Sequence, residues 1–439
     1  MPPPQKKKLN VTDKVKIQLP VSELKIGMYV CELDCPWEDT PFLFQGFVIE
    51  TPEDIATLKS YSHYALIDKS LSKKVMLPKY TTAERGVSTE IHSVSKRKSR
   101  FSFLSKKPKQ PRELIDLRQE LQPAFSTFRS SNNLISSIWE DVRGGKDIDT
   151  VAAKEAVSRC VDSISRNPSA LVLLTQIKNK DSYTSQHSMN VSIYSIAFGR
   201  HLGMNHLELN ELGLAGLLHD AGKMLTPDSI LKKPGRLTTE EFEVMKRHPA
   251  DGRDILLSSS GLADSAIDVA HGHHERLHGG GYPLGLAAHE ISHYTRIVAI
   301  VDFFDAITSE RAYKYGSNSF QALRMLHANS DAAFDKELVT QFIECVGVFP
   351  AGTIVEMNNG EIGIVVQAHK KYRLKPRVII VLDEEKNHCP VHYLDLSESP
   401  VDRHGQLYQI KTVRHHRDFN INLGGFIQKY LIQDQLGLI

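Results

Sequence analysis

Residues 209–223 read LNELGLAGLLHDAGK, a leucine-rich run that ends in a histidine, an aspartate and a lysine. The apolar spacing predicts a helix that places Asp220 on the flank beside its inward face. That face carries Leu212, Ala215, His219 and Lys223. A buried carboxylate without a partner is costly, so Asp220 needs a cation or hydrogen-bond donors nearby. This stretch therefore predicts a helical domain with polar chemistry in its interior.

Two more polar residues lie in apolar helical segments. His187 is aimed inward because it shares a helical stripe with Val191, Tyr194 and Phe198. Asp302 follows the apolar run RIVAIV, on a helix that is otherwise suited to the core. Each has an ordinary alternative, since a single inward histidine is more often a hydrogen-bonded core residue and Asp302 could pair with an arginine. Only their combination with other such residues indicates a site.

His248 is a further candidate. Thr238 with Glu241 three residues later is a capping-box pattern, which predicts the start of a helix that leads to His248. Because Pro249 follows at once, we expect His248 to stand at the end of this helix.

Residues 271–286, HGHHERLHGGGYPLGL, hold four histidines within eight residues, followed directly by three glycines. The histidines are His271, His273, His274 and His278. Two explanations are open for this segment by itself: a chance accumulation of histidines, or a metal site.

Together these residues predict a polynuclear metal centre inside the helical domain. The expected set is His187, His219, Asp220, His248, Asp302 and the pair His273 and His274. No cysteine accompanies it, which excludes a sulfur-rich structural zinc site. Two metals suit displacement at phosphorus, because one makes a hydroxide available near neutral pH and both neutralise charge on the attacking and leaving oxygens. Lys223 could hold a phosphate oxygen or, equally, close its helix as a surface lysine.

Composition places the chain among folded multidomain proteins. With 439 residues it is too long for one ordinary core, and 41% hydrophobic with 24% charged residues is a balance typical of folded proteins. The formal net charge of +2 predicts no overall attraction to nucleic acid polymers. No secretory signal and no apolar run of membrane-spanning length is recognisable, so we expect a cytoplasmic protein without a membrane span.

Five scattered cysteines fit reduced thiols in an intracellular protein: Cys31, Cys35, Cys160, Cys345 and Cys389. The spacing of the first two loosely resembles half of a zinc site. Since no second half is recognisable, structural thiols are the preferred interpretation.

The predicted fold class is multidomain, with a mainly α-helical domain between a small strand-containing domain and a small β appendage. The expected parts are an N-terminal regulatory domain with strands at 1–95, a basic linker at 96–112, the helical domain at 113–349, and the β appendage with a C-terminal tail at 350–439. A hairpin turn at Asn359-Gly360 marks the appendage. The linker holds eight basic residues and no acid, which also leaves open a contact with anionic lipid or nucleic acid.

Two motifs resemble a known family. HDAGK at 219–223 resembles the signature of the HD phosphohydrolase superfamily, and HHERLHGGGYP at 273–283 resembles the longer signature of its HD-GYP branch. The segments YTSQHSMNVS around His187 and RIVAIVDFFDAITSERAYK at 296–314 are similar to flanking parts of HD-GYP domains. Residues from 15 to about 110 resemble a domain of unknown function that often precedes such domains. The resemblance implies an HD-type catalytic domain.

The family implies hydrolysis of the bacterial second messenger cyclic di-GMP, to the linear dinucleotide pGpG or on to GMP, by a centre of two or three metals. Carried over by position, one metal would be held by His187, His219, Asp220 and Asp302. The other would be held by His248, His273 and His274, with Asp220 bridging. Lys223 would touch the scissile phosphate. Nitrogen and oxygen ligands accept several divalent metals, of which iron or manganese is expected here.

Further ligand contacts are implied at Asp181, Arg311 and Lys314. The last two are three residues apart, which suits two phosphate contacts from one face of a helix end. Family members with a third metal carry a glutamate shortly before the first histidine, whereas Ser182 and Tyr183 stand here. Two metals, without a third, are therefore expected.

The glycine-rich segment would form an ordered lip beside the metals. Its three glycines permit close backbone approaches, and Pro283 stiffens the exit. Tyr282 either stacks on a guanine or packs beneath the loop. Position 278 is His where the family usually has Asp, so His278 either changes how the loop is held or is an adventitious ligand. Family members also use this loop to contact diguanylate cyclase (GGDEF) domains.

The leading hypothesis is a metal-dependent cyclic di-GMP phosphodiesterase with an N-terminal regulatory module. Two alternatives remain: a metal-loaded sensor of cyclic di-GMP with weak catalysis, and an HD phosphohydrolase that acts on another nucleotide.

Overall fold

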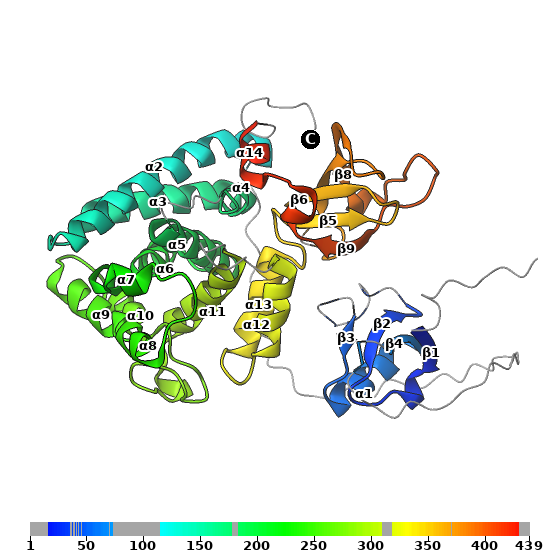
Figure 1. Ribbon diagram of the computed structural model, residues 1–439, viewed down its shortest axis with the longest axis horizontal. Coiled ribbons are helices and arrows are strands. Elements are labelled where there is room, and N and C mark those ends of the chain that lie inside the picture. Colours follow the sequence, from blue (N-terminus) through cyan, green and yellow to red (C-terminus); the bar gives the residue numbers. More distant parts are fainter. Residues whose placement is uncertain are drawn as a thin grey trace, which may run out of the picture. The chain divides into compact units, whose positions relative to one another are not determined.

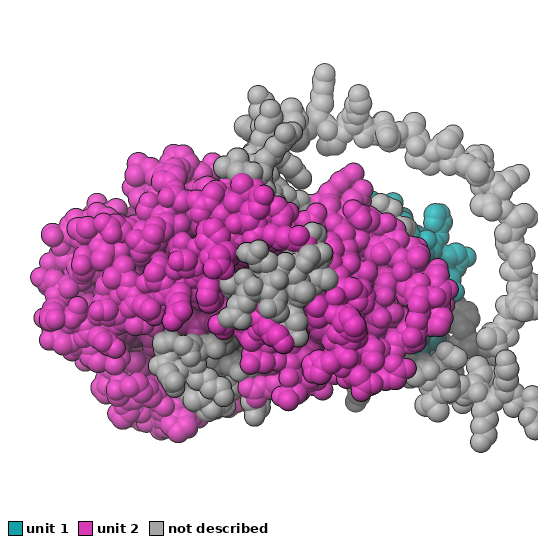
Figure 2. Space-filling model, turned by 90° about the horizontal axis from the view of Figure 1, so that it is seen from above, with its two compact units in different colours: residues 1–107 teal, residues 108–439 magenta. Residues whose placement is uncertain are grey.

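The computed structural model describes residues 16–35, 37, 40, 42, 44, 46–69, 71–72, 115–177, 183–309, 318–369 and 371–429. The chain divides into two compact units, residues 1–107 and residues 108–439, which are coloured separately in Figure 2. The basic segment 96–112 lies outside the described residues, so its expected role as a linker stays a prediction.

The described part of the first unit contains a four-stranded antiparallel sheet and an α-helix (Figure 1). The strands are β1 (Lys16–Pro20), β2 (Tyr29–Leu33), β3 (Phe47–Val48) and β4 (Tyr64–Asp68), in the order β1-β4-β2-β3. Helix α1 (Pro52–Tyr61) begins at a capping box between Thr51 and Asp54 and buries Leu58 in the core of this unit. The strands expected near the N-terminus are thus confirmed.

Cys31 lies on β2, and its thiol donates a hydrogen bond to the backbone oxygen of Leu66 at 3.1 Å. Among the described residues, neither Cys31 nor Cys35 belongs to a group of potential metal ligands. The structural interpretation of both thiols stays a prediction.

Helices build most of the second unit (Figure 1). They are α2 (Leu117–Arg143), α3 (Thr150–Arg166), α4 (Pro168–Leu174), α5 (Tyr183–His201), α6 (His206–Leu218), α7 (Asp228–Leu231), α8 (Thr239–Met245), α9 (His248–Ser258), α10 (Asp264–Gly272), α11 (His293–Thr308), α12 (Ser319–Ala328) and α13 (Lys336–Val346). A 3₁₀ helix, η4 (Ala221–Leu225), follows α6 directly.

Helices α5 and α6 approach each other closely because two glycines of α6 face α5. A Cβ on Gly213 would lie 2.7 Å from Cγ1 of Ile196, and one on Gly216 would lie 3.0 Å from Oγ of Ser195. Contacts this short leave no room for a side chain. The close packing brings His187 of α5 beside the C-terminal end of α6.

Aromatic contacts hold α5, α11 and α13 together. Phe304 of α11 meets Tyr194 of α5 at a centroid distance of 5.4 Å and Phe342 of α13 at 5.3 Å, and Phe342 meets Phe198 at 5.3 Å. Edge-to-face pairs of this kind are favourable beyond their burial. They fix α11 against α5, and with it the side chain of Asp302.

Two predicted helix ends are wrong. The helix expected to run through Lys223 ends at Leu218, with His219 as its C-terminal cap, and the chain then turns into η4. His248 begins α9 instead of ending the preceding helix, because Pro249 takes the second position of α9, where its missing N–H costs nothing. The capping box of Thr238 and Glu241 at the start of α8 is confirmed.

The C-terminal part forms a five-stranded antiparallel sheet in the order β8-β7-β6-β5-β9. The strands are β5 (Ile354–Met357), β6 (Ile362–Gln367), β7 (Arg377–Leu382), β8 (His388–Asp395) and β9 (Ile410–Arg414). The hairpin predicted at Asn359-Gly360 joins β5 to β6, and Gly360 takes a φ of +97° there. The short helix α14 (Leu423–Phe426) adds Phe426 to the core of the sheet.

The predicted fold class is confirmed: a mainly helical domain, a small N-terminal sheet and a small C-terminal sheet. Strand β6 contacts α4, and both belong to the unit of residues 108–439, so the boundary expected at 349/350 stays a prediction. Within the described ranges, every helix is too short or too polar to cross a membrane.

Candidate metal centre

The predicted ligands come from five places in the helical domain and converge. Their positions are His187 on α5, His219 and Asp220 after α6, His248 at the start of α9, His273 and His274 after α10, and Asp302 on α11. Three overlapping groups of potential metal ligands form there, and in each group the ligand atoms lie within 4.8 Å of one another. Helix ends supply most of these side chains, since the chain turns at those points and can aim neighbouring residues at one place.

The first group consists of His187, His219 and Asp302. Nε2 of His187 lies 3.1 Å from Oδ1 of Asp302, and Nε2 of His219 lies 3.8 Å from the same oxygen. All three side chains are buried. One carboxylate and two imidazoles facing one point form a ligand set that suits several divalent transition metals.

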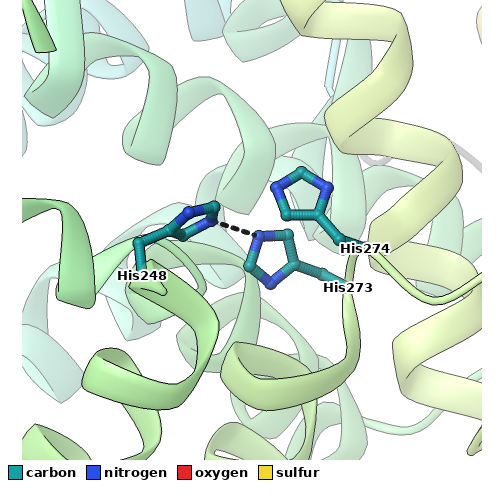
Figure 3. Close-up of side chains that lie close together, drawn as sticks. All are labelled: His248, His273 and His274. Carbon is teal, nitrogen blue, oxygen red and sulfur yellow. Dashed lines mark hydrogen bonds between the residues drawn. The ribbon is translucent and has the colours of Figure 1, made fainter. Parts of the chain in front are cut away.

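The second group consists of His248, His273 and His274, whose rings lie next to one another in Figure 3. The Nε2 atoms of His248 and His273 are 3.3 Å apart. His274 lies beside both, with ring centroids 4.9 Å from His248 and 4.2 Å from His273.

Asp220 lies between the two groups and directs one oxygen to each. Its Oδ2 is 3.5 Å from Nε2 of His187 and 3.3 Å from Nε2 of His219. Its Oδ1 is 3.4 Å from Nε2 of His248 and 3.6 Å from Nε2 of His273. A carboxylate placed in this way can bridge two metal ions.

Backbone carbonyls set the orientation of three of the imidazoles. Nδ1 of His219 lies 2.7 Å from the oxygen of Gly216, Nδ1 of His248 lies 2.7 Å from that of Met245, and Nδ1 of His273 lies 3.0 Å from that of Ala270. Because a carbonyl only accepts, each Nδ1 carries the proton and each Nε2 presents a lone pair to the centre.

This arrangement fits bound cations. The lone pairs of His248 and His273 face each other at 3.3 Å and cannot satisfy one another. Among the described residues, Nε2 of His219 and Oδ1 of Asp220 are buried without a hydrogen-bond partner. Buried acceptors without donors are costly, and a divalent ion removes that cost by taking their lone pairs.

The pKa values match ligand chemistry in the second group. Burial, together with the charge of Lys223, lowers the pKa of His248 to about 3. Burial also lowers the pKa of His273, and burial with the neighbouring His273 lowers that of His274 well below its ordinary value. These imidazoles are therefore neutral near pH 7, the form that binds metals.

In and around the first group, histidine and aspartate side chains shift one another's pKa values. Burial by itself would raise the pKa of Asp220 and of Asp302, but the surrounding imidazoles, and Lys223 for Asp220, outweigh burial and hold both pKa values well below the ordinary range. Burial would lower the pKa of His187, but hydrogen bonds to Asp302 and Asp305 outweigh it and raise the pKa to about 9. Without metal, His187 is thus an imidazolium at pH 7.

Lys223 reaches the centre from η4. Its Nζ lies 2.5 Å from Oδ2 of Asp220, and the side chain is 20% exposed. It therefore adds a positive charge at the edge of the group, with part of its surface open to a ligand.

The glycine-rich loop is packed as expected. A Cβ on Gly281 would overlap the backbone of Glu275, and Gly279 has a φ of +77°. The buried carboxylate of Glu275 accepts hydrogen bonds from the amides of Leu284 at 2.7 Å and Leu286 at 3.0 Å. These contacts hold the loop in one conformation beside the second group.

Tyr282 stacks on the ring of His274, with centroids 4.6 Å apart and an angle of 27° between the rings. His278 is exposed, and its Nδ1 accepts a hydrogen bond from the amide of Gly280 at 2.8 Å. It caps the loop and lies outside the ligand groups. His271 is half-buried on α10 and also lies outside them.

Family models match three parts of the chain. Residues 171–338 match an HD domain, residues 16–153 match a domain of unknown function (DUF3391), and residues 354–401 match a KOW domain associated with HD domains. A cyclic di-GMP phosphodiesterase of Pseudomonas aeruginosa is 35% identical over 384 residues, which cover 87% of this chain and 89% of that protein.

The chain belongs to the HD-GYP family. A cyclic di-GMP phosphodiesterase of Thermotoga maritima is 39% identical over 38% of this chain and 45% of its own length. A 3'3'-cGAMP-specific phosphodiesterase of Vibrio cholerae is 35% identical over 39% of this chain and 37% of its own length. The chain thus spans most of the Pseudomonas relative and less than half of these two.

Two residues of this HD-GYP domain were missed by the sequence analysis. Asp305 is buried, its Oδ2 lies 2.7 Å from Nδ1 of His187, and its Oδ1 accepts a hydrogen bond from Asn190 at 3.0 Å. It orients His187 as the carbonyls orient the other imidazoles. Asp305 follows Asp302 by three residues on the same helix, and this spacing could have indicated that both face the site. The only sequence feature that could have indicated Glu275 is its position shortly before the three glycines.

Several predicted contacts cannot be located in the structure. Asp181, Arg311 and Lys314 lie outside the described residues, as does Ser182, and the side chain of Tyr183 is likewise not described. The substrate contacts and the expected absence of a third metal therefore stay predictions.

The HD-GYP centre depends on a close approach at Gly222. A Cβ there would overlap the backbone oxygen of His248 and the amide nitrogen of Gly252. Backbone atoms cannot move aside as a side-chain end can. We expect Gly222→Ala to separate η4 from α9 and to lower the bound metal per chain, measured by mass spectrometry of the purified protein.

The matched control is Gly424→Ala, since a Cβ at Gly424 would meet Cγ2 of Ile177 at an ordinary 3.5 Å. A full metal content in Gly222→Ala would contradict this account of the site.

Metal binding should depend on pH through His187. Its pKa of about 9 means that an ion entering the first group displaces a proton at pH 7. We expect the affinity for the metal ion to rise about tenfold per pH unit up to pH 9 and then to level off. Calorimetry of the metal-free protein in buffers of different ionisation enthalpy measures the proton release. His187→Ala should abolish it, and a release that persists in this variant would point to another group.

Proposed function

We propose that the chain is a metal-dependent phosphodiesterase that hydrolyses cyclic di-GMP. The observation that carries the proposal is Asp220, whose two oxygens face two separate groups of buried ligands. The long similarity to a cyclic di-GMP phosphodiesterase of Pseudomonas aeruginosa supports the substrate. The expected product is pGpG, and efficient further cleavage to GMP is not expected from a centre of two metals.

Two divalent cations, iron or manganese, would occupy the groups and act as Lewis acids that neutralise negative charge developing at phosphorus. His187, His219 and Asp302 would hold one ion, and His248, His273 and His274 would hold the other. Asp220 would bridge them. The proposal of two ions, without a third, is supported by Ser182 and Tyr183 in place of a glutamate.

Lys223 would hold the scissile phosphodiester. Its ammonium is anchored on Asp220 and partly exposed, so one side can donate to a phosphate oxygen while the other neutralises the bridging carboxylate. The low pKa values of Asp220 and Asp302 keep both carboxylates ionised throughout the neutral range. Asp181, Arg311 and Lys314 would add contacts to the rest of the substrate, and Tyr282 would line its path.

A second candidate substrate is 3'3'-cGAMP. Relatives from Vibrio cholerae named as specific for it are 34 to 37% identical over about two fifths of this chain, so the HD-GYP part alone is similar to enzymes of both names. A metal-loaded cyclic di-GMP sensor with weak catalysis is the non-enzymatic alternative.

The parts outside the centre would regulate it. We assign residues 1–95 to a regulatory module and the loop from Gly279 to Pro283 to contacts with GGDEF domains. The protein would act in a bacterial cytoplasm. The match of residues 16–153 to a single family model supports an N-terminal module that is shared with relatives.

The test is turnover. The protein is purified with iron or manganese under reducing conditions and incubated with cyclic di-GMP and, separately, with 3'3'-cGAMP, and the products are separated by chromatography. Release of pGpG supports the proposal. Binding of cyclic di-GMP without any product, by a preparation that carries metal, would support the sensor instead.

Two variants separate metal binding from chemistry. Asp220→Ala should lose both metals and all turnover, because it removes the carboxylate whose two oxygens face the two groups. Lys223→Ala should keep its metal but lower kcat by about 100-fold, the usual loss when one charged group that stabilises the transition state is removed. Metal content and initial rates are measured on the same preparations. Normal turnover by Asp220→Ala would refute the site.

A further inference from the structure

A line of aromatic rings leads from the second ligand group towards the surface. Tyr282 stacks on His274, as described above, and Phe242 of α8 meets Tyr282 with centroids 6.4 Å apart and an angle of 78° between the rings. Phe242 is thus separated from a predicted metal ligand by a single intervening ring.

Phe242 remains 43% exposed although it is a large apolar residue. Lys246 of the same helix places its ammonium 5.1 Å from the ring centroid, and Tyr282 covers another part of the ring. A phenylalanine that served only the core would be buried. The ring of Phe242, next to Tyr282, is therefore partly open to a ligand.

The helix that carries Phe242 is well anchored. Its first turn is closed by the capping box of Thr238 and Glu241, and Nζ of Lys233 lies 2.5 Å from Oε2 of Glu241. The loop that carries Tyr282 is fixed by Glu275. Both rings are therefore held in place before any ligand arrives, which lowers the entropy cost of binding one.

We propose that Phe242 and Tyr282 form an aromatic corner that receives one purine base of the cyclic dinucleotide. This inference rests on the proposed function. Base and phosphate of a nucleotide are joined through one sugar, so a base whose phosphate lies at the ligand groups can reach a ring one side chain farther out. The two rings meet nearly at right angles, so a base can stack on one and touch the edge of the other.

The aromatic corner would bind a purine base by stacking alone, without hydrogen bonds that distinguish one base from another. Stacking on an aromatic ring tolerates either purine, because every base has a π-face. The corner would therefore serve cyclic di-GMP and 3'3'-cGAMP alike, and discrimination between the two would have to come from other contacts.

The test compares Phe242→Ala with Val244→Ala. Val244 lies two positions along the same helix, and therefore on nearly the opposite side, and its exposure of 37% is similar. With cyclic di-GMP as substrate we expect KM to rise about tenfold in Phe242→Ala, with a much smaller change in kcat. Phe242→Tyr, which keeps the ring, should restore KM, and Val244→Ala should match the unmodified protein.

A spectroscopic measurement reports the stacking directly. In a cyclic di-GMP analogue with 2-aminopurine in place of one guanine, stacking quenches the fluorescence. We expect quenching by the unmodified protein and by Phe242→Tyr, and its loss in Phe242→Ala at saturating protein. If the unmodified protein turns over cyclic di-GMP while KM and quenching are unaltered in Phe242→Ala, the corner is refuted and the proposed function stands. If the unmodified, metal-loaded protein neither binds nor cleaves cyclic dinucleotides, both are refuted.

Discussion

The buried carboxylate of Asp220 is the constraint on which the helical domain depends. A carboxylate that is 1% exposed is tolerated only where positive charge or donors surround it. Here each oxygen faces two imidazole nitrogens, and Lys223 approaches from the edge. The cost of burying this charge and the ability to hold two cations are therefore properties of the same arrangement.

Several backbone features serve that arrangement. Carbonyl oxygens at helix ends accept hydrogen bonds from the Nδ1–H groups of three imidazoles, so the Nε2 lone pairs point towards the centre. Asp305 does the same for His187 with a carboxylate, and the hydrogen bonds to Asp302 and Asp305 together outweigh burial and raise the pKa of that imidazole to about 9. The two ligand groups consequently differ before any metal binds: one consists of neutral imidazoles, and the other contains the imidazolium of His187 beside the carboxylates of Asp302 and Asp305.

Two side chains, His278 and Glu275, accept backbone hydrogen bonds from the loop beside the second group. His278 stands where the family pattern that the sequence resembles implies an aspartate, and its Nδ1 accepts a hydrogen bond from the amide of Gly280 two residues later. A carboxylate at this position could accept the same amide in an Asx-turn. The imidazole can thus hold the loop as a carboxylate would, and Glu275 accepts three further hydrogen bonds from backbone amides of the loop.

The sequence by itself determined the type of chemistry. Histidines and aspartates in apolar helical segments are too costly to bury without a purpose, so their spacing indicated the ligand set, and the local hairpin and capping signals were also correct. The helix predicted to run through Lys223 and the helix end predicted at His248 were wrong. A periodic pattern does not reveal tertiary contacts such as the approach of Gly222 to His248, and Pro249 fits the first turn of the helix that follows. Only the tertiary structure decided which oxygen of Asp220 faces which group, and that Asp305 and Glu275 support the centre, because these relations join residues far apart in the chain.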